Sequence, residues 1–296
     1  MERIDFIATD GVVLNGLLYK SNNSTKKVIL AVHGMSSNCF KDRDIIIAKY
    51  ANENNIDYFC FNNRGSELVK YIKKEIQGKE EKLLAGTSYE DVLEGYEDIV
   101  GAILKLKELG YEDIYLQGHS LGCTKIVYTY NELKDEEDEI IHDIKGVILL
   151  SLVDVASSIE VYLGDKYDTY IQLAEEKEQA GLSYEFMPKE SFIHPISVKT
   201  FLRYARDNSA IDFARYGQDT ELEKLNNIED PLFMRWGNEH EMIIQKADEL
   251  VNLLSDIIKN ERKDIDYIDG ADHGYTGKEE ILAKQIIEFI NKYSNR

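Results

Sequence analysis

The stretch whose residue types and spacing could do chemistry is GHSLG, residues 118–122, with Ser120 at its centre. An apolar run at residues 114–116 precedes it and predicts a β-strand, and a helix-periodic segment begins at about Cys123. A serine at a sharp bend between strand and helix projects its hydroxyl clear of the sheet. Flanking glycines remove the Cβ atoms that would collide there. The spacing therefore predicts that Ser120 is a nucleophile.

The elements that must position Ser120 alternate along the chain. Apolar runs predict further strands at residues 27–32, 57–61, 146–152, 231–236 and 264–268. Helical periodicity predicts helices at residues 42–54, 89–109, 243–258 and 279–293. This alternation is typical of a doubly wound α/β fold with a mostly parallel sheet. Residues 3–7 and 12–19 predict an N-terminal hairpin, and the charged segment 67–86 predicts an excursion at the rim.

With its strand and helix, the GHSLG run resembles the nucleophile elbow of the α/β-hydrolase superfamily, of the serine esterase and lipase type. Two further motifs extend this resemblance: His33-Gly34 after the strand at 27–32, and GADHG, residues 270–274, after the last strand. The resemblance implies an α/β-hydrolase fold with His273 as the base. It also implies an oxyanion hole made by the backbone N–H groups of Met35 and Leu121.

The acid that would orient His273 departs from the family pattern. Many relatives carry G-x-x-D after the strand at 231–236, whereas this chain has a histidine at the usual aspartate position, with Glu239 and Glu241 on either side. Glu241 can serve if the turn is one residue longer. Asp154, which follows the strand at 146–152, is the alternative acid. We expect Glu241.

Two narrower resemblances concern the segment before the elbow. GTSYE, residues 86–90, is similar to a pattern in the group that includes siderophore-type esterases. Arg64-Gly65 matches a familiar turn of the superfamily, for which we expect a supporting role.

The alternation breaks between Asp154 and Asp230, where no buried strand is predicted and tyrosines and phenylalanines are frequent. In the superfamily, insertions at this point commonly form a cap over the serine. We expect a core domain of residues 1–153 and 230–296 and a helical cap insertion of residues 154–229. An aromatic cap suits an apolar substrate group.

Composition excludes several classes of partner. A net charge of −20 disfavours binding to nucleic acid and to anionic membranes, and no apolar run approaches the roughly 20 residues of a membrane span. The same charge predicts a neutral, partly apolar ester substrate. Cys39, Cys60 and Cys123 lack pairing or metal-ligand spacing, which predicts packing residues and a reducing compartment. The first predicted strand begins at Arg3, so a cytoplasmic location is expected.

These observations predict a hydrolase that cleaves carboxylic esters through an acyl-enzyme intermediate, without a cofactor or metal. One alternative is a catalytically silent α/β-hydrolase fold used as a binding or sensor protein, suggested by the irregular acid position. Others are acyltransferase, thioesterase and amidase chemistry with the same serine. The sequence does not indicate an oligomeric state.

Overall fold

The computed structural model describes residues 1–206, 211 and 222–294. Eight strands form one sheet in the order β1-β2-β4-β3-β7-β8-β9-β10. Six neighbouring strands, β4, β3, β7, β8, β9 and β10, are parallel to one another. Strand β2 is antiparallel to both of its neighbours, β1 and β4. The strand bounds are β1 Glu2–Ile7, β2 Val13–Tyr19, β3 Lys27–Val32, β4 Asp57–Asn62, β7 Asp113–His119, β8 Ile144–Leu150, β9 Leu232–Gly237 and β10 Lys263–Ile268.

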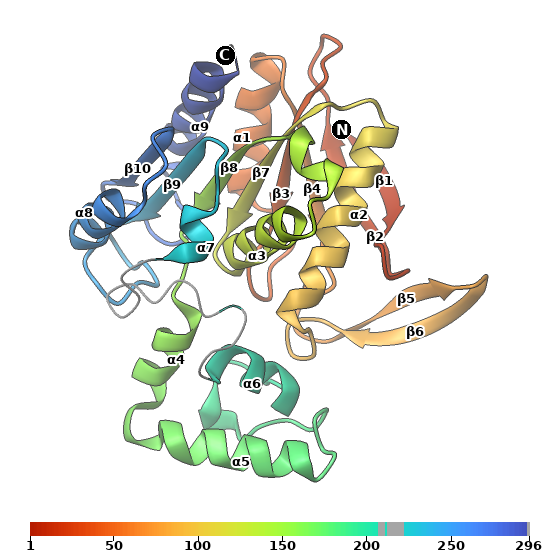
Figure 1. Ribbon diagram of the computed structural model, residues 1–296, viewed down its shortest axis with the longest axis vertical. Coiled ribbons are helices and arrows are strands. Elements are labelled where there is room, and N and C mark those ends of the chain that lie inside the picture. The colour runs from red at the N-terminus through yellow and green to blue at the C-terminus, as the bar shows by residue number, and fades with distance from the viewer. Residues whose placement is uncertain (207–210, 212–221, 295–296) are drawn as a thin grey trace.

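Helices cover both faces of this sheet, because alternate side chains of each central strand point to opposite faces. In β3, Val28 and Leu30 pack in one apolar core, and Ile29 and Ala31 pack in the other. Helices α2, α3 and α8 contribute to the first core, and α1 and α9 to the second (Figure 1). Their bounds are α1 Asp42–Glu53, α2 Gly95–Glu108, α3 Leu121–Asp135, α8 Ala247–Ile257 and α9 Glu279–Tyr293. The predicted doubly wound, mostly parallel α/β fold is confirmed.

The rim excursion at residues 67–86 is a two-stranded antiparallel hairpin, β5 Lys70–Ile76 and β6 Lys79–Ala85. It projects from the body of the molecule in Figure 1. The sequence shows no strand alternation there because β5 and β6 carry charged side chains and much of the hairpin is exposed. Its turn is made by Gln77 and Gly78, both with positive φ, as a type I′ two-residue hairpin turn requires.

Two helices begin later than their apolar periodicity predicts. Helix α2 begins at Gly95 after a short 3-10 turn, Val92–Glu94, whereas helix was expected from residue 89. The Asp91 carboxylate accepts the Leu93 N–H at 3.2 Å and so caps this turn. Helix α8 begins at Ala247, because residues 238–246 form the loop that carries Glu241.

Beyond the sheet lie three helices of the predicted insertion, α4 Val155–Leu163, α5 Tyr167–Gln179 and α6 Val198–Ala205 (Figure 1). A fourth, α7 Glu223–Asn226, packs back against α3 of the core. Residues 207–210 and 212–221 of the expected cap lie outside the described part of the chain. The proposed boundaries at residues 153 and 230 remain a prediction.

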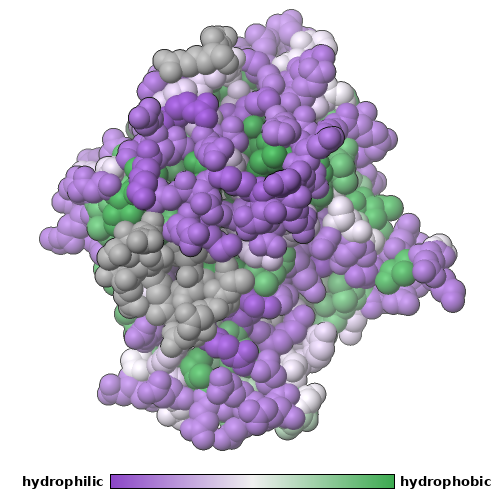
Figure 2. Space-filling model, in the orientation of Figure 1, coloured by the Kyte–Doolittle hydropathy of each residue, from purple (hydrophilic) through white to green (hydrophobic). Residues whose placement is uncertain are grey.

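The surface agrees with the acidic, charge-rich composition. Figure 2 shows a mostly hydrophilic face with scattered apolar side chains. Among the described residues, no helix combines the length and apolar character needed to cross a membrane. Cys39, Cys60 and Cys123 are buried and free, as expected of packing residues.

Candidate active site

Ser120 occupies the bend between β7 and α3 with φ 55° and ψ −127°. Non-glycine residues rarely adopt this conformation, so the surrounding structure must hold it in place. The Ser120 N–H donates to the Leu150 carbonyl at 2.9 Å, and the Ser120 carbonyl accepts the Cys123 N–H at 2.9 Å. These bonds fasten the bend to β8 on one side and to the first turn of α3 on the other.

The glycines around Ser120 are required by close backbone contacts. A Cβ on Gly118 would lie 2.6 Å from the Cys123 backbone, and one on Gly122 would lie 2.2 Å from the Val32 carbonyl oxygen. A Cβ on Gly34 would lie 2.8 Å from the Ser120 Cβ. Side chains at these positions would therefore force β3, β7 and α3 apart.

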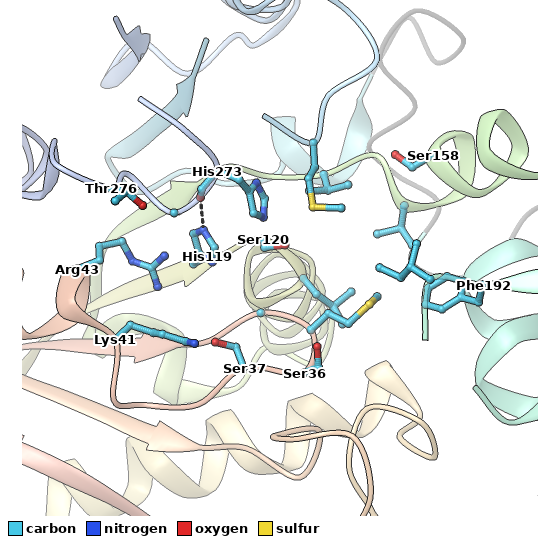
Figure 3. A pocket seen from close by; sticks show the side chains of 18 of the residues that line it. Ser36, Ser37, Lys41, Arg43, His119, Ser120, Ser158, Phe192, His273 and Thr276 are labelled. Carbon is cyan, nitrogen blue, oxygen red and sulfur yellow. Dashed lines mark hydrogen bonds between the residues drawn. The ribbon is translucent and has the colours of Figure 1, made fainter. Parts of the chain in front are cut away.

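His273 and Glu241 meet beside Ser120, although they come from different loops. The His273 Nδ1 and the Glu241 Oε1 are within hydrogen-bonding distance of each other. The His273 ring points toward Ser120 in Figure 3, and both residues line the same cavity. The segments after β7, β9 and β10 thus bring the three side chains together at the carboxyl ends of these strands.

The Glu241 side chain is 3% exposed, and its carboxylate accepts several hydrogen bonds. Its Oε2 accepts the Gly237 N–H at 2.9 Å and the Ser151 hydroxyl at 2.7 Å. Burial alone would raise the pKa of Glu241. The hydrogen bonds from His273, Gly237 and Ser151 outweigh burial and hold the pKa of Glu241 below its usual range. The carboxylate is therefore ionised at neutral pH.

The longer turn expected for Glu241 is present. His240 has φ 51°, a left-handed conformation that accommodates one more residue before the carboxylate. The neighbouring Glu239 is exposed, and its N–H donates to the Ala271 carbonyl at 2.9 Å. Glu241, not Glu239, is thus the glutamate of this turn that reaches His273.

Asp154 lies elsewhere. Its carboxylate caps the N-terminus of α4 by accepting the Ser157 N–H at 3.0 Å. It is not among the described residues that line the cavity containing Ser120 and His273. Its position is that of a helix cap rather than a partner of the imidazole.

The two candidate oxyanion donors, the Met35 and Leu121 N–H groups, belong to residues that line this cavity. Leu121 is the first residue of α3, so its N–H has no acceptor within the helix. The loop carrying Met35 is braced by His33, whose Nδ1 lies 2.8 Å from the Gly34 carbonyl and whose Nε2 accepts the Asn63 N–H at 3.2 Å. Burial lowers the pKa of His33 to about 3, so the ring is neutral.

His119, the second residue of the GHSLG run, contacts the His273 loop directly. Its Nε2 lies 2.7 Å from the His273 carbonyl oxygen and donates to it, and the two ring centroids are 4.9 Å apart. Burial lowers the pKa of His119 well below its usual range. The neutral His119 ring therefore fixes the backbone of His273, the candidate base, through this hydrogen bond.

The cavity around Ser120 has a volume of about 720 Å³ and two chemically different ends. Figure 3 shows Phe192 and Ser158 on one side of Ser120, and Lys41, Arg43, Ser37 and Thr276 on the other. The first end is apolar and is formed largely by the insertion, with lining residues Val153, Val155, Ile159, Tyr162, Phe192 and Ile193. The second end carries charges that no sequence motif had indicated.

Sequence reasoning also missed how the insertion is attached. Residues 86–91, here called the anchor loop, bind α6 and the segment before it. The Ser88 hydroxyl donates to the Pro195 carbonyl at 2.6 Å, and the Ser88 carbonyl accepts the Ser197 N–H at 2.8 Å. Arg203 of α6 donates two hydrogen bonds of 2.8 Å to the Asp91 carboxylate.

At the centre of the anchor loop, Glu90 forms a buried ion pair with Lys125 of α3. The Lys125 Nζ lies 2.6 Å from the Glu90 Oε2, and both side chains are 1% exposed. The Tyr204 hydroxyl of α6 donates to the other carboxylate oxygen at 3.2 Å. A Cβ on Gly65 would lie 1.9 Å from this carboxylate, so the expected supporting role of Arg64-Gly65 includes making room for Glu90. The GTSYE pattern could have indicated this loop, but not its partners.

The chain resembles known proteins in structure but not in sequence. No protein-family model matches the sequence, and no curated protein matches it significantly. Solved structures, in contrast, match over nearly the whole chain. The esterase Est1E from Butyrivibrio proteoclasticus, solved with ferulic acid bound, is 16% identical with a TM-score of 0.68, covering 98% of this chain and 99% of that one.

Two fungal proteins are similar in the same way. The siderophore hydrolase EstB from Aspergillus fumigatus is 12% identical with a TM-score of 0.69, covering 100% of this chain and 98% of that one. The α/β hydrolase GrgF from a Penicillium species is 15% identical with a TM-score of 0.67, covering 99% and 98%. At these identities the similarity establishes the fold rather than the substrate. The strand order, the two helical layers and these structural neighbours together show that the chain has the α/β-hydrolase fold.

Proposed function

We propose that the protein is a serine hydrolase that cleaves carboxylic esters, with Ser120 as nucleophile, His273 as base and Glu241 as acid. The observation that carries the proposal is the contact between Glu241 and the His273 Nδ1, which leaves Nε2 to face the cavity that contains Ser120. A carboxylate, an imidazole and a hydroxyl in this order form a charge arrangement suited to acyl transfer.

In the proposed reaction, the Ser120 hydroxyl attacks the ester carbonyl carbon while His273 takes its proton. The carbonyl oxygen becomes an oxyanion and accepts hydrogen bonds from the Met35 and Leu121 N–H groups. When the intermediate collapses, the protonated His273 gives its proton to the departing alcohol oxygen, and the acyl group stays on Ser120. A water molecule, deprotonated by His273, then attacks the acyl carbon. As the bond to Ser120 breaks, His273 returns the proton to the Ser120 oxygen, and the carboxylic acid leaves.

Glu241 would act by holding His273 rather than by accepting its proton. An ionised carboxylate at Nδ1 keeps the Nδ1–H tautomer and stabilises the imidazolium that forms during attack. The donors from Ser151 and Gly237 keep Glu241 itself in place. A glutamate in this position is chemically equivalent to the aspartate of the family pattern.

The substrate proposal rests on the apolar end of the cavity. Aliphatic and aromatic side chains from Ile159, Tyr162 and Phe192 can cover an acyl or aryl group at about 25 cal/mol per Å² of apolar surface buried. The structural neighbours include an esterase solved with ferulic acid and a siderophore hydrolase, which supports a small-molecule ester as the substrate class. A cytoplasmic location remains part of the proposal.

The alternative of a silent binding or sensor protein depended on the irregular acid position. The contact between Glu241 and His273 instead supports a working triad. Thioesters and amides would be cleaved by the same residues, as would acyl transfer to an acceptor other than water, and no observation favours these over ester hydrolysis.

A fluorophosphonate probe tests the proposal directly, because it reacts with serine nucleophiles activated by a base. We expect stoichiometric labelling at Ser120, located by peptide mass spectrometry, and no labelling of heat-unfolded protein. A panel of p-nitrophenyl esters of increasing acyl length, run beside thioesters and amides, then identifies the bond cleaved. Absence of both labelling and hydrolysis would favour the silent-fold alternative.

A further inference from the structure

The polar end of the cavity combines cations and hydroxyls in a way the proposed reaction does not use. Arg43, near the start of α1, and Lys41, just before it, both line the cavity on the side away from the cap. Figure 3 shows the Lys41 ammonium directed toward the Ser37 hydroxyl, with the Arg43 guanidinium and Thr276 nearby. None of these four residues belongs to the GHSLG, HG or GADHG motifs.

Arg43 is the more informative of the two cations because it is buried. Its side chain is 5% exposed, and its Nε and Nη2 contact the Asp44 carboxylate at 3.3–3.4 Å, long for charged hydrogen bonds. Asp44 also accepts the Tyr58 hydroxyl at 3.0 Å. Within the described residues, the Arg43 Nη1 makes no hydrogen bond. A guanidinium has five N–H donors, so this side chain keeps donors available to the cavity.

Two carboxylates, Asp42 and Glu279, also line this end and weaken its positive potential. Asp42 is exposed and Glu279 is half-buried, whereas Arg43 is buried. Charges in contact with solvent are screened more strongly than charges held within the protein. Arg43 is itself paired with the buried Asp44, so it offers directed N–H donors rather than net charge, and Lys41 supplies the positive charge at this end.

The net charge of −20 acts differently from these contacts. It disfavours the approach of any anion over long distances, but at an ionic strength of about 0.15 M that effect is screened beyond about 8 Å. A charge-assisted hydrogen bond acts at contact and is little screened in a partly buried site. Local contacts can thus favour an anionic group in a cavity of a strongly acidic protein.

We propose that the Lys41 and Arg43 end of the cavity binds a carboxylate of the substrate, so that the substrate is an ester with an apolar group on one side of the scissile bond and a carboxylate on the other. Ser37, which lies beside the Lys41 ammonium in Figure 3, can donate its hydroxyl to the same group. This inference rests on the proposed function, and it replaces the neutral substrate that the net charge alone favours.

The test compares esters that differ only by methylation of a carboxylate. One pair is meta-carboxyphenyl butyrate and its methyl ester, with the carboxylate on the alcohol side. The other is the hemisuccinate of p-nitrophenol and its methyl ester, with the carboxylate on the acyl side. For one of these pairs, we expect Lys41→Gln and Arg43→Gln each to lower kcat/KM of the carboxylate ester about tenfold and to change that of the methyl ester less than twofold.

The matched control is Lys49→Gln, which removes the same charge from an exposed position on α1. It changes the long-range field as much as Lys41→Gln does but leaves the cavity unaltered. Arg43→Gln removes the cation paired with Asp44, so the melting temperature of this variant is measured alongside. If Arg43→Gln does not fold, the result for Lys41→Gln decides. Equal losses for carboxylate and methyl esters in both pairs, or equal losses with Lys49→Gln, would overturn the proposal.

A binding measurement separates this proposal from the ester hydrolase itself. Ser120→Ala protein is titrated by calorimetry with meta-carboxyphenyl butyrate and with its methyl ester. We expect the carboxylate to bind about tenfold more tightly, and this preference to disappear when Lys41→Gln is added. If the wild-type protein hydrolyses no ester but the preference is present, the proposed function fails and the anion site stands. If hydrolysis occurs without the preference, the anion site fails alone.

Discussion

The candidate triad and the helices of the insertion are held in different ways. Ser120, Glu241 and His273 are fixed by short polar contacts at the ends of neighbouring strands, so small backbone motifs position them. Helices α4, α5 and α6 of the insertion pack through apolar side chains, and the anchor loop links the insertion to the rest of the chain. The candidate triad requires particular residues at particular positions. Much of the insertion requires only apolar side chains that pack together.

This difference indicates which changes should affect chemistry and which should affect the folded state. Contacts around the triad act on the reacting atoms, and removing one leaves the sheet intact. The buried pair in the anchor loop joins α3, which begins directly after Ser120, to α6 of the insertion. Breaking that pair should destabilise the protein as a whole, because it leaves a charge buried without its partner.

The largest effect is expected from Ser120→Ala. Removing the nucleophile should lower kcat for ester hydrolysis by at least about 10³-fold, because only binding and the oxyanion donors remain. The fold should survive, since the Ser120 side chain caps no helix and its backbone bonds persist. Steady-state kinetics and circular dichroism measure the two quantities. A variant that retained near-wild-type turnover would remove Ser120 from the mechanism.

The next effect distinguishes the two acids. Glu241→Gln should lower kcat by about 10²- to 10⁴-fold with a small change in melting temperature, because the amide no longer favours the tautomer needed at His273. Asp154→Asn should leave kcat nearly unchanged, since Asp154 caps α4. The two variants are compared at one pH with one substrate. A severe loss from Asp154→Asn together with a mild one from Glu241→Gln would exchange the two roles.

Substitutions at the contacts of the anchor loop should lower the free energy of unfolding rather than kcat. Glu90→Gln leaves Lys125, which is 1% exposed, without a counter-charge and should lower the free energy of unfolding by about 3–5 kcal/mol. Tyr204→Phe, which removes one hydrogen bond to the same carboxylate, should cost about 1 kcal/mol and serves as the milder comparison. Denaturant unfolding measures both. Equal and small losses would mean that the ion pair contributes little.

The smallest effect depends on pH. The folded-state pKa values of His33 and His119 lie below the unfolded value of 6.5, because both rings are buried. Below about pH 6.5 the unfolded chain binds protons that the folded chain does not, so stability falls by about 1.4 kcal/mol per pH unit for each ring. His119→Gln should remove one such contribution between pH 6 and pH 5. A His142→Gln variant, changed at an exposed histidine, is the control. If the stability of His119→Gln fell with pH as steeply as that of the wild-type protein, the lowered pKa of His119 would be contradicted.

The sheet and the elbow could be predicted from the sequence because their signals are local. Strands buried on both faces appear in the sequence as apolar runs. Gly118 and Gly122 are required by close backbone contacts, with Cys123 five residues later or with Val32 of the adjacent strand. The acid could be narrowed to Glu241, with Asp154 as the alternative. Its selection over Glu239 depends on the left-handed conformation of His240, which a sequence does not display.

The anchor loop and the polar end of the cavity could not be predicted because they depend on distant partners. Glu90 falls within an apparent helical periodicity, yet its carboxylate faces Lys125 and Tyr204, which are 35 and 114 residues away along the chain. Arg43 and Lys41 sit near the start of an ordinary surface helix. Only the return of the chain after β7 and β10 places them in the same cavity as Ser120 and His273.

The conformation of Ser120 also bears on how such a protein can evolve. A non-glycine residue held at φ 55° and ψ −127° costs on the order of 1–3 kcal/mol, which glycine at the same position would largely relieve. Selection for thermal stability alone would thus favour losing the hydroxyl at position 120. The serine persists in a lineage only while its chemistry is under selection, and lineages that lose the activity should drift readily to glycine there.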